Sequence, residues 1–423
     1  MLATTASTCE TTLPQRLGEV LPRWLKEVPL YQATAAAAGV NGTATLALLQ
    51  RLPLLTKADL RRDFPRNVLR PGEELEALLA QNLAELEHTS GTSEERTPLL
   101  LARGWWNEQE ARALRLNGHV AQLLAAAPDA RRVTVSSPVC NGDISYAGVP
   151  APAERTIGTT LFVSLSRFPF LWTDEELARL AAETVAWQPV FLDTDPVYAV
   201  ALALYCERQG LRLPSLRFIL CSYEFVSVTH RRLLERAFGV PVYNLYGSTE
   251  TGHLLMEDDQ GQMTPSLETA FLEILEPDNQ GVGDLIVSTF TNEYLPLLRY
   301  RIGDLVARQE GAGGPTYVVH GRARDAFRSA TGARVTTRQI DECFAEVAGI
   351  AHYQMRERPG GEWRLRFVPD HTPPSPTALA ELRRRLTELL GLSSRLALEE
   401  TDLVMPESSG KFLLGYPAGR SPV

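Results

Sequence analysis

Short apolar runs alternate with segments of helical periodicity from about residue 131 onward. Strands are predicted at 133–137, 217–221 and 242–246, because each is a short run rich in β-branched, aromatic or other apolar residues. Helical periodicity fills the intervals between them. Strand and helix alternating at this spacing predict a parallel sheet covered by helices, so the body of the chain is expected to be α/β.

Capping residues mark where the helices of this body begin. Thr173 and Glu176 form a predicted capping box ahead of an amphipathic helix. Asp195 and Pro196 supply a cap and a first-turn proline to a second helix, predicted at 197–209. These local signals support the alternation of strands and helices.

The two ends of the chain differ from this body. The first ~85 residues are predicted to be helical and rich in loops. After about residue 319 the chain contains more arginine, and strand-like segments at 350–356 and 363–368 flank a Pro-Gly-Gly turn signal. A helix at 376–390 and a strand at 396–404 follow, so this end is expected to form a small α+β domain.

Composition narrows the class of protein. The 423 residues are 44% hydrophobic and 22% charged, as in soluble globular proteins, and the formal net charge of -9 argues against a nucleic-acid binder. The five cysteines are scattered without a C-x-x-C pair, so neither a zinc knuckle nor a disulfide framework is predicted. No secretory signal and no apolar stretch of ~20 residues is visible, and we expect a cytoplasmic protein without a membrane span.

Common catalytic signatures are absent from the sequence: it contains no P-loop, no H-E-x-x-H and no G-x-S-x-G. Five short segments remain as candidates for chemistry. They are His-Thr-Ser-Gly-Thr-Ser at 88–93, Tyr-Gly-Ser-Thr-Glu at 246–250, Arg-Tyr-Arg-Ile-Gly-Asp at 299–304, Gly-Arg-Ala-Arg-Asp at 321–325 and Ser-Gly-Lys-Phe at 409–412.

Each segment has both a functional and a purely structural interpretation. The hydroxyls and glycine of 88–93 could bind a phosphate, or form an ordinary surface turn. Segment 246–250 follows a strand, where α/β sheets place ligands, and offers an aromatic ring for a base and a carboxylate for Mg²⁺; it could equally be a turn. Asp304 could accept hydrogen bonds from both ribose hydroxyls of a nucleotide. Lys411, considered without the other segments, could be an ordinary exposed lysine.

Taken together, the order and spacing of these segments resemble the adenylate-forming enzymes, and among them the phenylacetate–coenzyme A ligase-like branch. The strongest matches are 246–250, 299–304 and 409–411, and the similarity extends back to Leu-Pro at 52–53. The resemblance implies a two-step reaction. ATP and a small carboxylic acid, expected to be aromatic, give an acyl-adenylate, and the acyl group then passes to a thiol, most simply that of coenzyme A.

The resemblance also implies domains and site residues. It implies a large multi-layer α/β domain over residues 1–320 that binds ATP and the acid, and a small mobile α+β cap over residues 321–423. Lys411 is expected to be the adenylation lysine, acting with Thr249 and with Glu250, which would ligate Mg²⁺. The ATP/AMP-binding residues implied are Ser90, Gly91, Thr92, Ser93, Ser222, Tyr223, Glu224, Tyr246, Gly247, Ser248, Asp304 and Arg322, and Arg324 or Asp325 would form the hinge.

The acid-binding site is expected to include Tyr146, Ala147 and Gly148, with His253 facing the acyl group. Lys411 and Mg²⁺ would stabilise the charge that develops when a carboxylate attacks the α-phosphorus. Movement of the cap would then withdraw the lysine and admit the thiol.

One departure from the family pattern concerns the phosphate loop. Ser93 is followed by Glu94 and Glu95, where the family commonly has glycine and lysine. Two carboxylates repel a triphosphate unless they point to solvent, so either Arg96 supplies the missing charge or the loop is remodelled. Arg324 also departs, since the family often has aspartate there.

Other acceptors and a non-catalytic role remain as alternatives. The acyl group could pass to an acyl-carrier protein or an amine instead of coenzyme A, and a degenerate member could bind a nucleotide without catalysis. The sequence also leaves the oligomeric state open, and a homodimer is one alternative.

Overall fold

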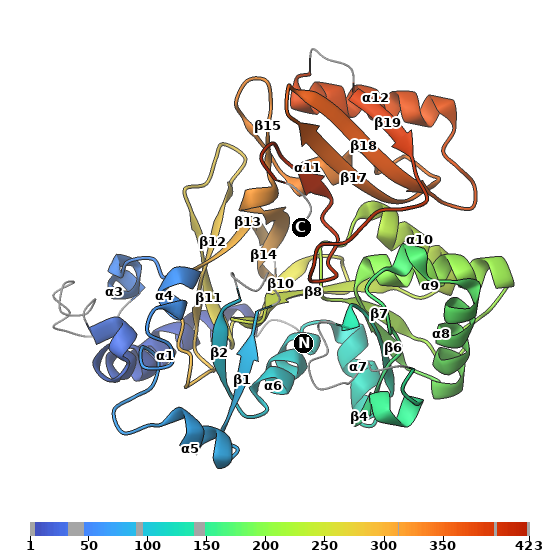
Figure 1. Cartoon of the computed structure of the whole chain (residues 1–423). Helices are drawn as coiled ribbons and strands as arrows, with labels where there is room; N and C mark the ends of the chain where they lie inside the picture. Colours follow the sequence, from blue (N-terminus) through green and yellow to red (C-terminus); the bar gives the residue numbers. More distant parts are fainter. Residues whose placement is uncertain are drawn as a thin grey trace. The chain divides into compact units, whose positions relative to one another are not determined.

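The chain is described here by a computed structural model that covers residues 5–32, 46–89, 96–138, 149–311, 313–392 and 396–420. It divides into two compact units (Figure 1). The first unit consists of residues 1–121 and 245–319, and the second of residues 122–244 and 320–423. No helix in the described part of the chain is both long enough and apolar enough to cross a bilayer.

The first unit combines helices with an antiparallel sheet. Its elements are α1 (Thr5–Glu27), α3 (Leu46–Arg51), α4 (Lys57–Arg61), α5 (Leu75–Ala80), β1 (Ala84–His88), β2 (Pro98–Ala102), α6 (Trp105–Leu114), the start of α7 (Gly118–Ala126), the end of β8 (Val242–Ser248), β9 (Gly252–Glu257), β10 (Met263–Pro265), β11 (Ala270–Leu275), β12 (Val282–Thr289), β13 (Tyr300–Gly311) and most of β14 (Gly314–Arg322). The strand order is β11-β12-β13-β14-β10-β9-β8, and β1 pairs separately with β2.

Apolar side chains of α1 and of the sheet form the core of this unit. Leu17, Leu21 and Trp24 are fully buried and belong to one cluster with Val287 of β12 and Tyr300 of β13. The cluster fixes the position of β13, which carries Asp304.

The second unit contains two larger sheets and one short antiparallel pair of strands. Its elements are β3 (Arg132–Val135), η2 (Pro152–Arg155), β4 (Thr156–Ile157), β5 (Thr160–Phe162), η3 (Pro169–Leu171), α8 (Asp174–Trp187), β6 (Phe191–Thr194), α9 (Pro196–Gln209), β7 (Phe218–Cys221), α10 (Val228–Phe238), η4 (Ala323–Asp325), β15 (Phe327–Arg328), β16 (Arg334–Val335), α11 (Thr337–Glu342), β17 (Ile350–Arg358), β18 (Glu362–Pro369), α12 (Pro376–Leu390), β19 (Leu396–Glu400) and β20 (Gly415–Tyr416).

The larger of these sheets is the predicted parallel sheet. β3, β5, β6, β7 and the start of β8 pair in parallel, in the order β8-β7-β6-β3-β5, and β4 adds an antiparallel edge. The capping box of Thr173 and Glu176 starts α8, and Asp195 caps α9 by accepting from the Val197 N–H at 2.9 Å. The expected strands and helices of this region are confirmed, and so is the α/β class.

The smaller sheet has the order β19-β18-β17-β20. β17 and β18 form the predicted antiparallel hairpin, and α12 covers one face of the sheet (Figure 1). Leu382, Leu386 and Leu390 of α12 are fully buried in this core. Strand β19 ends at Glu400, earlier than the predicted 404, because the Thr401 hydroxyl bonds both backbone groups of Leu403 and turns the chain.

The predicted domain boundary near residue 320 coincides with one of the points where the chain passes between the units, after Val319. Residues 320–423 group with residues 122–244, because β17 packs on α9 and α10. A separately moving cap over residues 321–423 stays a prediction.

Candidate active site

Three polar segments of the second unit follow buried parallel strands. Ser137 comes shortly after β3, Asp195 directly after β6, and Ser222–Glu224 directly after β7. Because parallel strands place their carboxyl ends at one edge of a sheet, these segments lie together there, where open α/β sheets bind ligands.

A turn of the C-terminal segment carries Lys411. The Glu407 N–H donates to the Lys411 carbonyl oxygen at 2.7 Å, and the Gly410 N–H donates to the Glu407 carbonyl oxygen at 2.8 Å. Gly410 has φ of 85°, in the left-handed region that favours glycine. A Cβ at Gly410 would also overlap Ser137 Oγ, so this close approach requires a glycine.

Side chains from residues 122–244 bind the backbone of this turn. The Ser137 hydroxyl donates to Ser409 O at 3.1 Å, the buried Tyr198 hydroxyl donates to Gly410 O at 3.0 Å, and Arg167 Nη1 donates to Ser408 O at 2.6 Å. The Phe412 N–H donates to Glu224 Oε1. These bonds dock the Lys411 turn at the carboxyl edge of the parallel sheet.

Aromatic packing holds the residue next to Lys411. The ring of Phe412 lies 5.7 Å from Phe170, 6.1 Å from Tyr198 and 5.5 Å from His352, measured between ring centroids. Phe412 is therefore an apolar anchor that limits where Lys411 can point.

The charge of Lys411 acts on two carboxyl groups at this edge, those of Asp195 and Glu224. Asp195 is 1% exposed. Burial raises the pKa of Asp195 to about 7, against the Val197 N–H and the charge of Lys411, which lower it. Burial and the charge of Asp195 also raise the pKa of Glu224 well above its usual range.

The segment expected to line the adenine has its own internal support. Ser222 Oγ donates to Asp193 Oδ1 at 3.0 Å, and the Tyr223 hydroxyl lies 3.4 Å from Asp193 Oδ2. The structure thus brings Ser222, Tyr223 and Glu224 together with Lys411 in one unit, although almost 190 residues separate them along the chain.

Other expected nucleotide-binding residues lie in the first unit. The Tyr246 hydroxyl donates to Asp304 Oδ2 at 2.6 Å, and Asp304 is buried. This bond joins the residues predicted to flank the base and to bind the ribose. Gly247 allows the tight hairpin to β9, since a Cβ there would overlap the Gly252 carbonyl oxygen. Ser248 and Thr249 lie half-buried in the same hairpin.

Glu250 is buried beside a lysine that the motif analysis did not assign to the site. Lys57 Nζ lies 2.8 Å from Glu250 Oε1, which also accepts from the Tyr300 hydroxyl at 3.0 Å. Burial raises the pKa of Glu250, but the charge and hydrogen bond of Lys57 outweigh it, and the net shift is downward.

This environment does not fit a magnesium ligand. The carboxylate of Glu250 is only 4% exposed, and an ammonium and a phenol already satisfy one of its oxygens. Mg²⁺ prefers several oxygen ligands and retained waters, and a cation next to Lys57 would be repelled. The geometry therefore does not support the predicted Mg²⁺ contact of Glu250.

His253 is buried in β9 rather than lining an exposed surface. Its ring centroid lies 4.7 Å from that of Trp106, with the ring planes tilted by 58°. A role facing the acyl group stays a prediction.

The expected hinge residues begin the C-terminal part of the second unit. Arg322 ends β14, Arg324 is largely exposed, and Asp325 is buried in an ion pair with Arg420. The phosphate loop residues Ser90, Gly91, Thr92 and Ser93, the departures Glu94 and Glu95, and the acid-binding candidates Tyr146, Ala147 and Gly148 all lie outside the described residues.

Sequence reasoning missed several contributors to the site. The sequence predicts Asp195 only as a helix cap, and it assigns no role to Tyr198, inside the helix predicted at 197–209, or to Lys57. The one local signal was rarity: lysine occurs only at 26, 57 and 411 in a chain that otherwise uses arginine.

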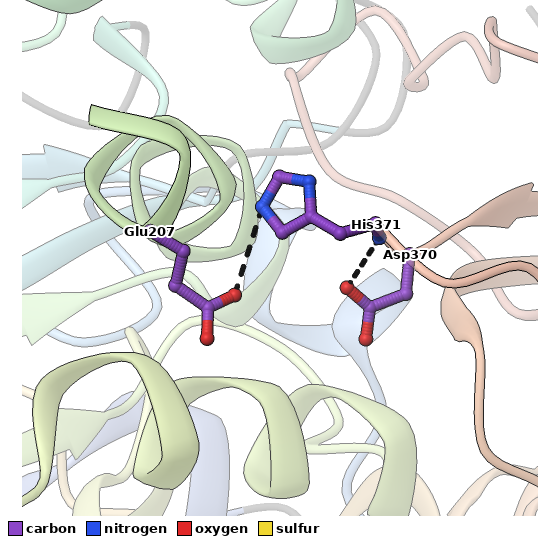
Figure 2. A group of neighbouring side chains, drawn as sticks. All are labelled: Glu207, Asp370 and His371. Carbon is purple, nitrogen blue, oxygen red and sulfur yellow. Dashed lines mark hydrogen bonds and ion pairs between the residues drawn. The ribbon is translucent and has the colours of Figure 1, made fainter. Parts of the chain in front are cut away.

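A further group of residues could in principle hold a metal ion. Figure 2 shows Glu207, Asp370 and His371, whose ligand atoms lie within 4.8 Å of one another. Arg236 already binds this group. Its Nε, Nη1 and Nη2 atoms donate hydrogen bonds of 2.6–3.0 Å to the carboxylate oxygens of Glu207 and Asp370. The site is therefore an ion-pair cluster, since a cation would have to displace the arginine.

Comparisons with known proteins agree with this geometry. No family model matches the chain. The chain is 24% identical to the phenylacetate–coenzyme A ligase of Escherichia coli, over 94% of this chain and 92% of that enzyme. It is 26% identical to the phenylacetate–coenzyme A ligase of Thermus thermophilus, over 82% of this chain and 78% of that enzyme.

Solved structures show the same fold. The crystal structure of 2-hydroxyisobutyryl-CoA ligase in the postadenylation state matches with a TM-score of 0.73 at 18% identity, covering 98% of this chain and 91% of that one. In sequence and in fold, the chain thus resembles the phenylacetate–coenzyme A ligase-like branch of the adenylate-forming enzymes, as its motifs predict.

Proposed function

We propose that this chain is an ATP-dependent acid–thiol ligase. It converts a small carboxylic acid and ATP into an acyl-adenylate and pyrophosphate, and then transfers the acyl group to the thiol of coenzyme A, releasing AMP. The observation that carries the proposal is the docking of the Lys411 turn beside Glu224, at the edge of the parallel sheet. The similarity to acid–coenzyme A ligases over nearly the whole chain supports it.

Lys411 supplies the charge that the first step needs. An anionic carboxylate attacking an anionic phosphate increases negative charge on the phosphoryl oxygens, and an ammonium held nearby stabilises it. Four hydrogen bonds hold the backbone around Lys411, from Ser137, Arg167, Tyr198 and Glu224. The lysine therefore loses little further conformational freedom when the reaction takes place.

The nucleotide is proposed to bind through the residues that the motifs imply. Ser222–Glu224 would line the adenine, Tyr246 would flank it, and Asp304 would accept hydrogen bonds from the ribose. Mg²⁺ is proposed to accompany the triphosphate, where it would neutralise phosphate charge. Because Glu250 is already satisfied by Lys57, no step is assigned to a metal bound there.

The acid is proposed to be small and aromatic, since two curated relatives are phenylacetate–coenzyme A ligases. Coenzyme A is the proposed acceptor, and an acyl-carrier protein is the alternative. Withdrawal of Lys411 with residues 321–423 after adenylation would open the site to the thiol.

ATP–pyrophosphate exchange over a panel of aryl and alkyl acids tests the first step. We expect exchange with at least one small aryl acid, and coenzyme A-dependent thioester formation with the same acid. Absence of exchange with every acid, in a folded protein that still binds ATP, would leave only nucleotide binding. Thioester formation on a carrier protein but not on coenzyme A would change the acceptor.

The Lys411→Ala variant tests the assignment of the lysine. We expect adenylation to fall by at least about a hundredfold, the scale of removing one charge-stabilising group. Thioester formation from a supplied acyl-adenylate should persist. Lys26→Ala is the matched control, because Lys26 is exposed at the end of α1. Equal adenylation by both variants would show the assignment to be wrong.

A further inference from the structure

The parallel sheet of the second unit carries hydroxyl groups on one buried face. Every second residue of β3, of β5 and just after β5 lies in the apolar core of this unit, namely Val133, Val135, Leu161 and Val163. Successive side chains of a strand alternate, so the residues between these point to the opposite face. There Thr134, Ser136 and Ser164 are only 2%, 0% and 1% exposed. Parallel strands buried on both faces are normally apolar throughout, so packing alone does not account for these three hydroxyls.

The hydroxyls lie together at the carboxyl ends of β3 and β5. Thr134 pairs with Phe162, and the Val163 N–H donates to the Thr134 carbonyl oxygen at 3.2 Å. Ser136 and Ser164 each lie two residues beyond this pair, so their side chains share one face and one edge of the sheet. Thr134, Ser136 and Ser164 are called the hydroxyl face below.

These hydroxyls lack partners within the protein. None of the three oxygens has a hydrogen-bond partner among the residues that the structure describes. Burial without a partner is unfavourable because the hydroxyl loses its hydration, and nearly all buried polar groups of native proteins are therefore bonded. Three unpartnered hydroxyls at one edge indicate that their partner is supplied from outside the chain.

The hydroxyl face adjoins the segments that the ligase reaction uses. Thr134 also pairs with Asp193 of β6, which accepts the hydroxyl hydrogen of Ser222 in the segment expected to line the adenine. Ser137, next to Ser136, binds the turn that carries Lys411. In the strand order β7-β6-β3-β5, the adenine segment follows β7 and the hydroxyls lie on the other side of β6. An acid whose carboxylate meets the α-phosphate at Lys411 would therefore have the hydroxyl face within reach of its other end.

We propose that the hydroxyl face binds a neutral hydroxyl or amino substituent of the carboxylic acid, so that the substrate is a hydroxy- or amino-substituted aryl acid. The inference rests on the proposed function, because it names the class of acid that the ligase activates. Serine and threonine hydroxyls both donate and accept, which matches either substituent. The three carry no positive charge and Asp193 lies next to them, so a second carboxylate on the acid would lose its hydration without compensation.

ATP–pyrophosphate exchange tests this preference. Benzoate is compared with the hydroxy- and aminobenzoates, and phenylacetate with its hydroxy and amino derivatives. We expect at least one substituted acid to exceed its parent by about tenfold or more in kcat/KM, because a site built to hydrogen-bond a substituent rejects the analogue that lacks it. In Ser136→Ala/Ser164→Ala this preference should fall by about tenfold, while exchange with the parent acid stays within about twofold.

The matched control is Ser266→Ala in the first unit. Ser266 is also buried, but its hydroxyl bonds that of Thr269 at 2.8 Å. This variant should keep the preference for the substituted acid.

Binding and stability are measured without catalysis. A substituted acid should raise the unfolding temperature more than its parent does, and the difference should disappear in Ser136→Ala/Ser164→Ala. Without acid, this double variant should unfold at the same urea concentration as the unmodified protein, because no bond within the protein is lost. Ser266→Ala should unfold at a lower one.

The outcomes separate the two proposals. A lower urea midpoint in the double variant, as in Ser266→Ala, would show that the hydroxyls bond within the folded protein and overturns the inference. Exchange with an unchanged preference in the double variant also overturns it, while the ligase function stands. If no acid supports exchange but substituted acids bind and the double variant loses that binding, the ligase proposal fails and the hydroxyl site stands. Absence of both exchange and binding overturns both.

Discussion

Glu250 has a buried carboxylate that pairs with protein side chains rather than with the expected metal ion. Glu250 ends the Tyr-Gly-Ser-Thr-Glu segment, where a metal ligand was expected. In the structure, Lys57 from α4 and Tyr300 from β13 approach the same oxygen. A buried carboxylate needs such partners because its hydration is lost.

Removing this cation is predicted to destabilise the protein. Lys57→Met leaves the Glu250 carboxylate buried without its ion pair, so the free energy of unfolding should fall by about 2 kcal/mol, a figure reduced because Lys57 is 37% exposed. Urea unfolding at pH 7 measures the effect, and Lys26→Met serves as the control. Equal stability of the two variants would contradict a structural role for the pair.

At the level of elements, α10 and β17 meet through a pair of buried histidines. His230 Nε2 lies 3.0 Å from His352 Nδ1, and the rings are nearly parallel. Their other ring nitrogens have no hydrogen-bond partner among the described residues. Burial lowers the pKa of His230 to about 3, and burial together with the charge of His230 lowers the pKa of His352 well below its usual value.

This pair predicts acid sensitivity of the α10–β17 packing. Both imidazoles stay neutral when folded but take up protons near pH 6.5 when unfolded. Their contribution is complete above that pH and is lost as the pH falls towards the folded-state pKa values. Each should add a slope of about 1.4 kcal/mol per pH unit in this window. Urea unfolding between pH 7 and 5 should show a shallower dependence of the free energy of unfolding on pH in His230→Gln than in the unmodified protein, and an equal dependence would contradict the prediction.

At the scale of the whole chain, residues from two distant stretches form one unit. Residues 320–423 pack on α9 and α10, and the group of Glu207, Asp370 and His371 shown in Figure 2 lies at this junction. Arg236 of α10 bonds Glu207 of α9 and also Asp370 after β18. Burial raises the pKa of Asp370, but hydrogen bonding to Arg236 gives a net lowering.

Arg236→Gln is predicted to loosen residues 320–423 from α9 and α10. Both ion pairs are lost, and the free energy of unfolding should fall by about 1 kcal/mol. The effect is small because the arginine is half exposed to solvent and salt. Hydrogen exchange should become faster in β17 and α10 while β12 and β13 stay unchanged. Arg338→Gln, which removes a pair within α11, is the control. Unchanged exchange in β17 would show that apolar packing alone holds the junction.

Local signals were sufficient to predict much of this chain. The cap at Asp195 and the box of Thr173 and Glu176 act within one helical turn, so α8 and α9 were predictable from neighbouring residues. Parallel pairing of β3, β6 and β7 followed from the alternation of strands and helices. The motif at 409–412 was visible because its residues are adjacent in the chain.

Contacts between distant residues were not predictable in the same way. No periodicity relates Lys57 to Glu250, or Glu224 to the backbone of Phe412, since each pairing depends on where strands end in space. The sequence determined the residue types, the helix caps and the strand order along the chain, because these depend on short-range geometry. The burial of each carboxyl group, and the cation that compensates it, came from packing of the folded chain, which alone sets the loss of water and the distance between charges.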